Sequence, residues 1–298
     1  MKIVVVGHLV LDELHLFDGN VVESFGGIYF AIGAFAAISS QNDSVIPIFP
    51  FGNDMQERLN ERIRRLRHIS SDGMYALPVP TTRVKLFYDT QTSYNTCLVT
   101  ELPPIQYEKF IPYLDADLMY LNMMTASDIT LETAEAVRLN TPALLYLDTH
   151  MLAYRVAGEG SRHLQPQQDW KRWCAIADVV QMNEREIANF IEPGLQERTA
   201  VRKILDSGRT KHVVITRGEF GATVYSRDKQ DIQRIEIGVV PVDRLADTTG
   251  CGDSFGSAFA YKIALGCSLG ECGNFAALVA SHFATCYGSE GIEQLVIG

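Results

Sequence analysis

Several features that define common functional classes are missing from this sequence. Its 298 residues include six cysteines, none in a CxxC pair and none beside a His-rich cluster, which argues against a zinc site. No apolar run is long enough to cross a bilayer. The short apolar run at residues 2–6 lacks a small-residue cleavage site and reads as a first strand, so we expect a cytoplasmic protein with free thiols that does not bind membranes.

Basic charge is also scarce. Lys and Arg number 26 against 36 Asp and Glu, a net charge of −10. A nucleic-acid surface needs a basic face, so we expect no nucleic-acid partner. An anionic nucleotide is still compatible with this charge, because backbone amides and a metal ion can hold phosphate within an acidic protein.

No repeat or long linker divides the chain, and we interpret residues 1–298 as a single domain. Continuous apolar segments alternate with amphipathic ones, which predicts an α/β fold with a doubly wound, mostly parallel sheet covered by helices on both faces. The predicted strands cover residues 2–6, 44–49, 117–121, 143–148, 178–182 and 212–216. The predicted helices cover residues 28–39, 55–67, 131–138, 168–177 and 197–207.

Two antiparallel hairpins interrupt this alternation. Residues 81–89 and 93–100 alternate apolar and polar side chains around a turn at residues 89–91. Residues 13–17 and 21–25 flank Asp18-Gly19-Asn20, a good hairpin turn. Together, strands from about 13–25 and 80–103 would form a small β-sheet that serves either as a lid over a site or as a surface for homodimerisation.

The strongest chemical signal is Asp247-Thr248-Thr249-Gly250-Cys251-Gly252-Asp253, followed by a helix-like segment. The glycines allow close approach of an anion to the backbone, and the helix N-terminus adds its positive end. A carboxylate at Asp253 is electrostatically awkward there unless it accepts a proton from an alcohol while phosphate charge is held nearby. The alternative is that Asp253 only caps the helix.

This segment resembles the second signature of the PfkB (ribokinase-like) carbohydrate kinases, with Cys251 in place of the usual Ala. The resemblance extends from Gly7 to about Gly288 and implies a ribokinase-like fold with a β-lid. It implies an ATP-dependent phosphotransferase in which Asp253 is the general base and the amides around Gly250, Cys251 and Gly252 form an anion hole.

Other matches follow in the family's order. Asn183 and Glu186 resemble the Asn-x-x-Glu element, in which the Glu organises Mg²⁺ through water; a capped helix N-terminus is the alternative. Thr216, Gly218 and Gly221 resemble the turn that supports ATP, although any tight turn could need these glycines. Asn274, in a segment that we expect to open a helix at Gly273, resembles the adenine-side residues; helix packing is the alternative.

The N-terminal half resembles the family's substrate side. By the resemblance, Asp12 binds acceptor hydroxyls, and Gly26 and Gly27 let the acceptor approach the backbone. The family's Asn in the first turn of the next helix is absent here, where Tyr29 supplies either an aromatic wall or a hydroxyl to the acceptor, or else packs in the core with Phe30. Asp247 resembles the position beside which related kinases bind a monovalent cation such as K⁺; turn capping is its alternative.

The sequence does not decide whether the phosphoryl acceptor is a sugar or instead a nucleoside, an inositol or another polyol. Asp148 and His150, at the end of a predicted strand, could face nucleotide or acceptor, or His150 could be a solvated loop residue. No Walker A motif and no G-x-S-x-G elbow is present, which excludes a P-loop enzyme and an α/β-hydrolase. A non-catalytic, ligand-binding regulatory protein of the same fold is the alternative from another class.

Overall fold

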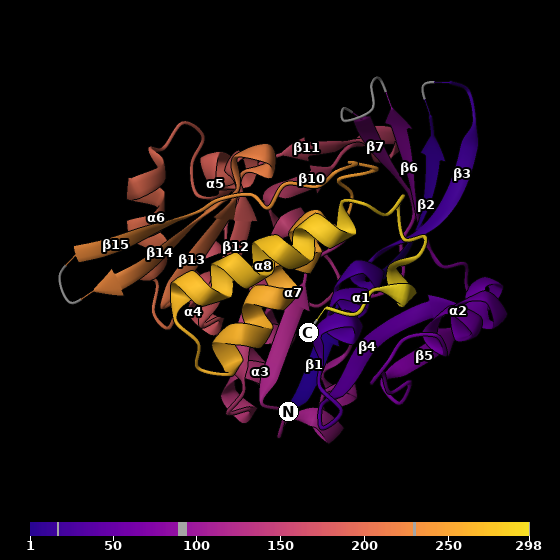
Figure 1. The fold of residues 1–298 in the computed structure, drawn as a ribbon, viewed down its shortest axis with the longest axis horizontal. Coiled ribbons are helices and arrows are strands. Elements are labelled where there is room, and N and C mark those ends of the chain that lie inside the picture. The colour runs from indigo at the N-terminus through magenta and orange to yellow at the C-terminus, as the bar shows by residue number, and fades with distance from the viewer. Residues whose placement is uncertain (17, 89–93, 229–230, 298) are drawn as a thin grey trace.

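The computed structural model describes residues 1–16, 18–88, 94–228 and 231–297. A nine-stranded sheet crosses the molecule in the order β15-β14-β13-β12-β9-β8-β1-β4-β5 (Figure 1). Its strands from β1 to β13 pair in parallel, and β14 and β15 add an antiparallel edge. The strands are β1 (Lys2–Val6), β4 (Ser44–Gly52), β5 (Met74–Leu77), β8 (Leu118–Asn122), β9 (Leu144–Asp148), β12 (Val179–Asn183), β13 (His212–Thr216), β14 (Ala222–Asp228) and β15 (Asp231–Ile237).

The order of strands reverses between β1 and β8. From β1 the chain builds outward through β4 and β5, and it then returns to β8 on the other side and builds through β9, β12 and β13. Open α/β sheets bind ligands at such a switch point, beyond the carboxyl ends of the strands. Gly7 and Asn122 lie there, because β1 ends at Val6 and β8 ends at Asn122.

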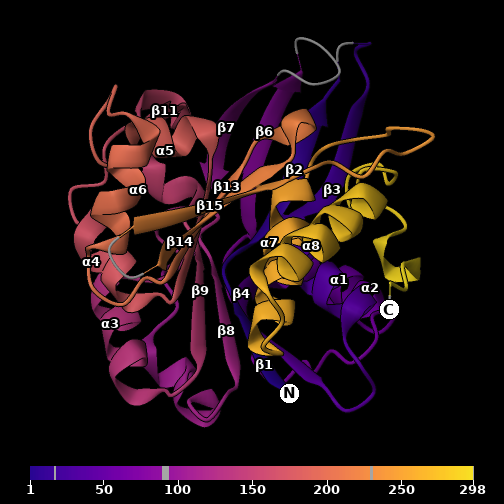
Figure 2. The same cartoon turned by 60° about the vertical axis from the view of Figure 1, so that its left-hand side comes forward.

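Alternate side chains of each central strand enter opposite cores. Ile3 and Val5 join one hydrophobic cluster, whereas Val4 and Val6 join the other, as the two-residue period of a strand requires. Figure 2 shows the two helical layers on either side of the sheet. One layer holds α1 (Ile28–Ile38), α2 (Gln56–Ile63), α7 (Cys251–Ala264) and α8 (Leu269–Phe283); the other holds α3 (Leu131–Asn140), α4 (Trp170–Ile176), α5 (Glu184–Phe190) and α6 (Glu197–Leu205).

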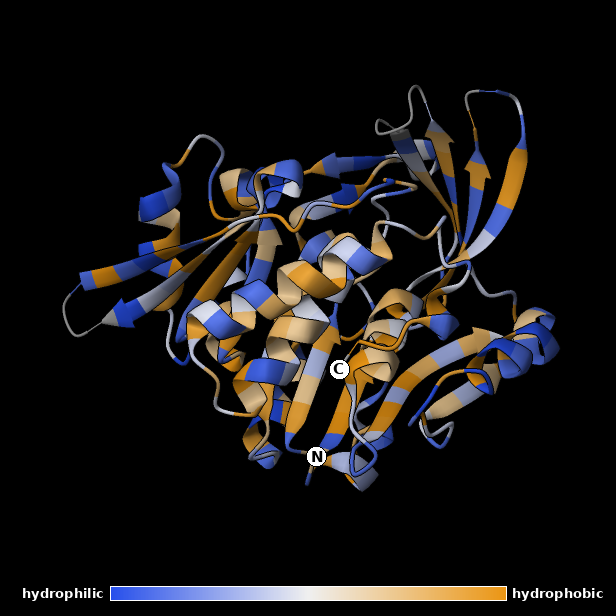
Figure 3. Ribbon diagram, in the orientation of Figure 1, coloured by the Kyte–Doolittle hydropathy of each residue, from blue (hydrophilic) through white to orange (hydrophobic). Residues whose placement is uncertain are grey.

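Hydropathy follows this burial. In Figure 3 the central strands and α1 are mostly apolar, whereas α2 and the edge strand β15 carry polar side chains. Every residue of α1 is buried, so Tyr29 is a core residue rather than an open aromatic wall. Seven short 3₁₀ turns complete the described helices: η1 (Asn53–Met55), η2 (Tyr107–Lys109), η3 (Ile111–Tyr113), η4 (His150–Ala153), η5 (Gly158–Gly160), η6 (Gly218–Phe220) and η7 (Ile292–Gln294).

A separate sheet of four strands, here called the small sheet, projects from the carboxyl edge of the large one (Figure 1). It consists of β3 (Val21–Gly27), β2 (Leu9–His15), β6 (Thr82–Tyr88) and β7 (Tyr94–Thr100), in that order. Both predicted hairpins are therefore present, although the predicted turn at residues 89–91 lies outside the described residues. A further hairpin of β10 (Tyr154–Val156) and β11 (Arg162–Leu164) contacts β7.

The predicted sheet is confirmed, but several details differ, and neither the edge strand β5 nor the β10–β11 hairpin was predicted. Helix α2 ends at Ile63, not Arg67, because the amides of Arg65 and Leu66 bond to the carbonyls three residues earlier instead of four. Helix α8 begins at Leu269 rather than Gly273, since Ser268 and Glu271 form a capping box. The edge strand β15 was not predicted. Within the described ranges, no helix combines the length and apolar character needed to span a bilayer.

Candidate active site

The N-terminus of α7 presents a glycine-shaped loop and an acid at one point. Gly250 is the N-cap, with a left-handed φ of 79°, and a side chain there would overlap the buried ring of Phe30. The Cys251 amide donates to the Thr248 carbonyl at 3.2 Å. Among the described contacts of this loop, no hydrogen bond to another residue occupies the amides of Gly250, Gly252 and Asp253, so these amides are left for an anion.

Asp253 lies in this first turn and is fixed by a neighbour on the sheet. Its Oδ1 accepts a hydrogen bond of 2.9 Å from Nδ2 of Asn122, at the end of β8. Burial raises the pKa of Asp253 above its usual value, and the charge of His150 and the Asn122 hydrogen bond oppose that rise. A raised pKa makes the Asp253 carboxylate a stronger base, which suits a group that accepts a proton.

A buried polar layer lies beneath the loop. Gln181 of β12 donates from Nε2 to the Gly252 carbonyl at 3.0 Å and to Oδ2 of Asp148 at 2.9 Å. Its Oε1 accepts from the hydroxyl of Tyr146 at 2.7 Å, and Tyr120 donates to the same Asp148 oxygen at 3.1 Å. Burial and the charge of Asp253 disfavour the ionised form of Asp148, so the pKa of Asp148 lies well above its ordinary value.

His150 faces this group of carboxyls. Its φ of 23° is a left-handed value that a non-glycine residue rarely adopts. Its Nδ1 lies 3.3 Å from Oε1 of Glu186, and 40% of its side chain is exposed, so the ring lines the site rather than the core. Burial alone would lower the pKa of His150, but the hydrogen bond to Glu186 and the charges of Glu186, Asp253 and Asp148 raise it to about 9.

The Asn-x-x-Glu element forms a capping box at the start of α5. Asn183 accepts from the amides of Arg185 and Glu186, both at 2.9 Å. Glu186, only 1% exposed, accepts from the Asn183 amide at 2.8 Å and from its side chain at 2.7 Å. The capped helix considered from the sequence is therefore present. Roles for Asn183 near phosphate and for Glu186 near Mg²⁺ stay predictions.

On the small sheet, Asp12 turns toward the same region. Its carboxylate lies across Gly26, where a side chain would overlap it, and Gly27 adopts a φ of 62° to begin α1. Gly26 is thus needed for the placement of Asp12. Burial raises the pKa of Asp12 to about 7, the charge of Arg162 opposes this, and Asp253 and Asp247 add to it.

Asp247 is held as a turn-capping residue. Its Oδ1 accepts from the amide and hydroxyl of Thr249 at 2.9 and 2.8 Å, and its Oδ2 accepts from the Gly288 amide at 3.0 Å. Tyr88, at the end of β6, hydrogen-bonds the Thr249 side chain. The small sheet therefore contacts the segment that leads into the α7 loop. A monovalent cation at Asp247 stays a prediction.

The predicted nucleotide side lies at the end of β13 and on α8. Gly218 and Gly221, with φ of 55° and 83°, form the turn between Thr216 and β14, and a side chain at Gly221 would overlap the Ile237 carbonyl. The Arg217 amide closes the turn on the Gly221 carbonyl at 2.8 Å. Asn274 is exposed on α8, one residue after Gly273, which packs on Ile237. Contacts of these residues with ATP stay predictions.

The residues present fit a hydrated Mg²⁺ better than a protein-built metal cage. Within the described ranges, no group of three or more His, Cys, Asp and Glu side chains is arranged to hold a metal ion. Both Glu186 oxygens already accept hydrogen bonds, which leaves lone pairs for water rather than for close coordination. Mg²⁺ commonly keeps several waters and binds chiefly through substrate phosphates.

All six thiols are free, as predicted. Burial raises the pKa of Cys251 to about 12, and Asp247 and Asp253 add to the effect. The Cys251 thiol is therefore protonated near neutral pH, despite its place at a helix N-terminus.

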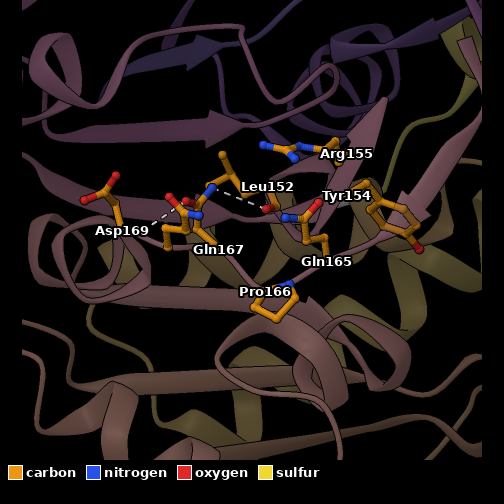
Figure 4. A pocket seen from close by; sticks show the side chains of 8 residues that line it. Leu152, Tyr154, Arg155, Gln165, Pro166, Gln167 and Asp169 are labelled. Carbon is orange, nitrogen blue, oxygen red and sulfur yellow. Dashed lines mark hydrogen bonds between the residues drawn. The ribbon is translucent and has the colours of Figure 1, made fainter. Parts of the chain in front are cut away.

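A surface pocket of about 160 Å³ lies beside η4 and β10 (Figure 4). Leu152, Tyr154, Arg155, Gln165, Pro166, Gln167, Gln168 and Asp169 line it. It contains neither Asp253 nor Asp12, so we locate the site from the convergence of side chains rather than from this hollow.

Sequence reasoning missed three residues of the site. Asn122 ends an apolar strand at the switch point, and a polar residue at that place was a usable signal. Gln181 lies within a strand, where nothing in the sequence distinguishes it from a surface residue. Arg162 reaches the region of Asp12 from the β10–β11 hairpin, which was not predicted.

A doubly wound sheet, a small antiparallel sheet at its carboxyl edge and an acid on a glycine-shaped helix N-terminus define a ribokinase-like phosphotransferase. The chain belongs to the pfkB family of carbohydrate kinases, whose profile matches residues 37–294, and it is a kinase.

The individual relatives share either low sequence identity with this chain or only part of its length. A cytidine kinase of Thermococcus kodakarensis is 24% identical over 274 residues, which is 91% of this chain and 92% of the relative. A ribokinase of Arabidopsis thaliana is 33% identical over 108 residues, 35% of this chain and 27% of the relative. A pyrophosphate-dependent kinase of the ribokinase family, complexed with a pyrophosphate analog and myo-inositol, superposes with a TM-score of 0.79 at 16% identity, covering 99% of both chains.

Proposed function

We propose that this protein transfers the γ-phosphoryl group of ATP to a sugar hydroxyl of a nucleoside, with Asp253 as the general base. The observation that carries the phosphoryl transfer is the convergence at the α7 N-terminus. There, the Asp253 carboxylate, held by Asn122, belongs to the Gly250–Asp253 loop, and its charge is close enough to Asp12 to raise the pKa of that carboxyl.

In this mechanism Asp253 accepts the hydroxyl proton as the acceptor oxygen attacks the γ-phosphorus. The bond from the γ-phosphorus to the bridging oxygen breaks, and ADP leaves with that oxygen. The amides of Gly252 and Asp253 stabilise charge on the transferring oxygens, and His150 adds a positive charge nearby. Mg²⁺, when bound, neutralises phosphate charge. Closure of the small sheet as a lid would exclude competing water.

The inner face of the small sheet favours a nucleoside over a fully hydroxylated polyol. Val10, Leu14, Val84 and Leu86 lie on the face that also carries Asp12, and they form a buried apolar cluster with Met124, which follows β8. A carboxylate at the edge of apolar side chains matches an acceptor with ribose hydroxyls on one side and a flat, less polar base on the other. The resemblance to a cytidine kinase over 91% of the chain agrees with this choice.

The direct test is ADP formation from Mg-ATP across nucleosides, free pentoses and hexoses, and inositols, with the phosphorylated product identified by phosphorus NMR. A parallel series replaces ATP with pyrophosphate. We expect turnover with ATP and a nucleoside. Turnover with only a free sugar or inositol would overturn the acceptor assignment, and turnover with pyrophosphate alone would overturn the donor assignment. Binding of ATP without product from any acceptor would favour a regulatory protein.

A further inference from the structure

We infer that Asn122 is a positioning residue for the reaction: its side-chain N–H fixes the Asp253 carboxylate, and its carbonyl oxygen accepts a hydrogen bond from the acceptor. This inference deepens the proposed function and rests on it. Asn122 is fully buried, at the carboxyl end of β8, next to the switch point of the sheet.

The donor half of the side chain is committed to Asp253. Nδ2 of Asn122 lies 2.9 Å from Oδ1, so one carboxylate oxygen is anchored. An anchored Oδ1 leaves Oδ2 as the oxygen that can take the acceptor proton. An N–H donor also favours the ionised carboxylate, the form that a general base needs.

The side-chain oxygen of Asn122, by contrast, receives no hydrogen bond from the described part of the protein. Oδ1 of Asn122 is buried and has no hydrogen-bond partner among the described residues. A buried polar atom without a hydrogen-bond partner costs about 1–3 kcal/mol. We therefore expect a bound ligand to supply the missing hydrogen bond. Since the other end of the same amide touches the base, a second hydroxyl of the acceptor is a ligand of matching chemistry and position.

The surrounding chain is shaped to hold this amide. Gly7, at the end of β1, abuts the Asn122 backbone so closely that a side chain there would overlap the Asn122 carbonyl. The next strand contributes Asp148, which Gln181 and Tyr120 engage through its Oδ2. Among the described residues, no side-chain hydrogen bond joins Asn122 to Asp148, Gln181 or Tyr120, so its link to Asp253 is separate from theirs.

The test compares Asn122→Leu and Asn122→Asp with the wild-type enzyme. Both remove the N–H donor at nearly constant volume, and the Asp variant also places a second carboxylate beside Asp253. We expect kcat to fall at least about tenfold, and by less than the roughly 10²- to 10⁴-fold that a positioned general base contributes in full. The KM for ATP should change little, while the KM for the acceptor should rise.

A pH profile separates positioning from a merely structural role. Asp253 is faced by His150 and Glu186, by Asp148 and by Asp12, all of which are unchanged in the variants. Loss of the N–H should therefore move the acid limb of kcat/KM to higher pH, further for Asn122→Asp than for Asn122→Leu. A uniform fall in rate without movement of the limb would overturn the inference, as would wild-type kinetics.

Two controls keep the result interpretable. Ser257→Ala removes a fully buried hydroxyl of α7 that has no hydrogen-bond partner among the described residues, and it should leave kcat unchanged. If Asn122→Leu fails to fold, Asn122→Asp carries the comparison. Absence of turnover in the wild-type protein would defeat the proposed function itself, whereas an active wild type with equally active Asn122 variants would defeat only this inference.

Discussion

At the scale of single residues, the site combines acids that oppose one another. Asp12, Asp148 and Asp253 all have pKa values raised first by burial, and Asp253 raises those of the other two further. Ionising these three buried carboxyls together costs folding free energy while no substrate is bound, because each negative charge disfavours the others. Proteins commonly retain this kind of cost where binding or catalysis uses it.

The cost at Asp12 leads to a prediction about stability. The folded pKa of about 7 exceeds the usual 3.8, so folding takes up a proton between these values. The stability that Asp12 contributes is thus fully present below about pH 4 and is lost as pH rises through about 7. Replacing Asp12 by Asn removes the loss, so Asp12→Asn should raise Tm at pH 8, with a gain that shrinks toward pH 4.

Thermal unfolding of both proteins from pH 4 to pH 8, without ligands, measures this gain. Glu108→Gln, which changes an exposed acid in η2, serves as the charge-matched control. An Asp12→Asn variant that is less stable than wild type at pH 8 would mean that Asp12 is ionised and favourably paired.

At the scale of elements, α7 depends on glycine for its approach to the sheet. A side chain at Gly256 would overlap the Tyr120 hydroxyl and lie 2.8 Å from Oε1 of Gln181. Gly256→Ala should therefore destabilise the protein by about 1–3 kcal/mol, because the polar layer must shift. It should also lower kcat, since Gln181 holds the Gly252 carbonyl.

Gly270→Ala is the matched control, in the first turn of α8, where an added Cβ meets nothing within 4 Å. It should be neutral or stabilise by up to about 1 kcal/mol. Urea unfolding of both variants measures the difference. Equal effects at the two positions would contradict the packing described for α7.

Elements with a local sequence signal could be predicted, whereas features that depend on contacts distant in sequence could not. Strands such as β1 and β13 are continuous apolar runs, and the sequence placed both at their observed bounds. The α7 loop was predictable too, because glycines next to an acid form a local signal. Gln181 was not, since its role depends on contacts with Asp148 and Gly252, far from it in sequence.

At the scale of the whole molecule, Arg62 of α2 fastens the C-terminal segment to the body. Its guanidinium pairs with Glu293 and with Glu290, at 2.8 Å for the latter, and donates to the Ser289 carbonyl at 2.6 Å. The neighbouring Ser289 hydroxyl lies 2.9 Å from that of Ser24 in β3. One arginine thus joins α2, the C-terminal segment and, through Ser289, the small sheet.

Loss of this connection should be costly. The side chains of Arg62 and Glu293 are only 13% and 8% exposed, so Arg62→Ala leaves a mostly buried carboxylate without its cation and with only the Tyr29 hydroxyl as a donor. We expect a loss of about 2–4 kcal/mol in the free energy of unfolding, near the range for broken buried pairs. Arg65→Ala, which breaks the exposed pair with Glu61, should change it by less than about 1 kcal/mol. Similar midpoints for the two variants in urea would contradict this account.

The overall architecture could be predicted because alternating strands and helices leave few topologies. The convergence of the site could be predicted only in part. The resemblance supplied Asp253 and Asp12, but the charges of Arg162 and His150 that act on these carboxyls come from elements that meet them only in the folded chain.

The central claim is that Asp253 is the general base, and turnover by Asp253→Asn tests it most directly. With the acceptor identified for the wild type, ADP formation is measured beside calorimetric binding of Mg-ATP. We predict that kcat falls by about 10²- to 10⁴-fold while ATP affinity changes little. Near-normal turnover in Asp253→Asn would contradict the account.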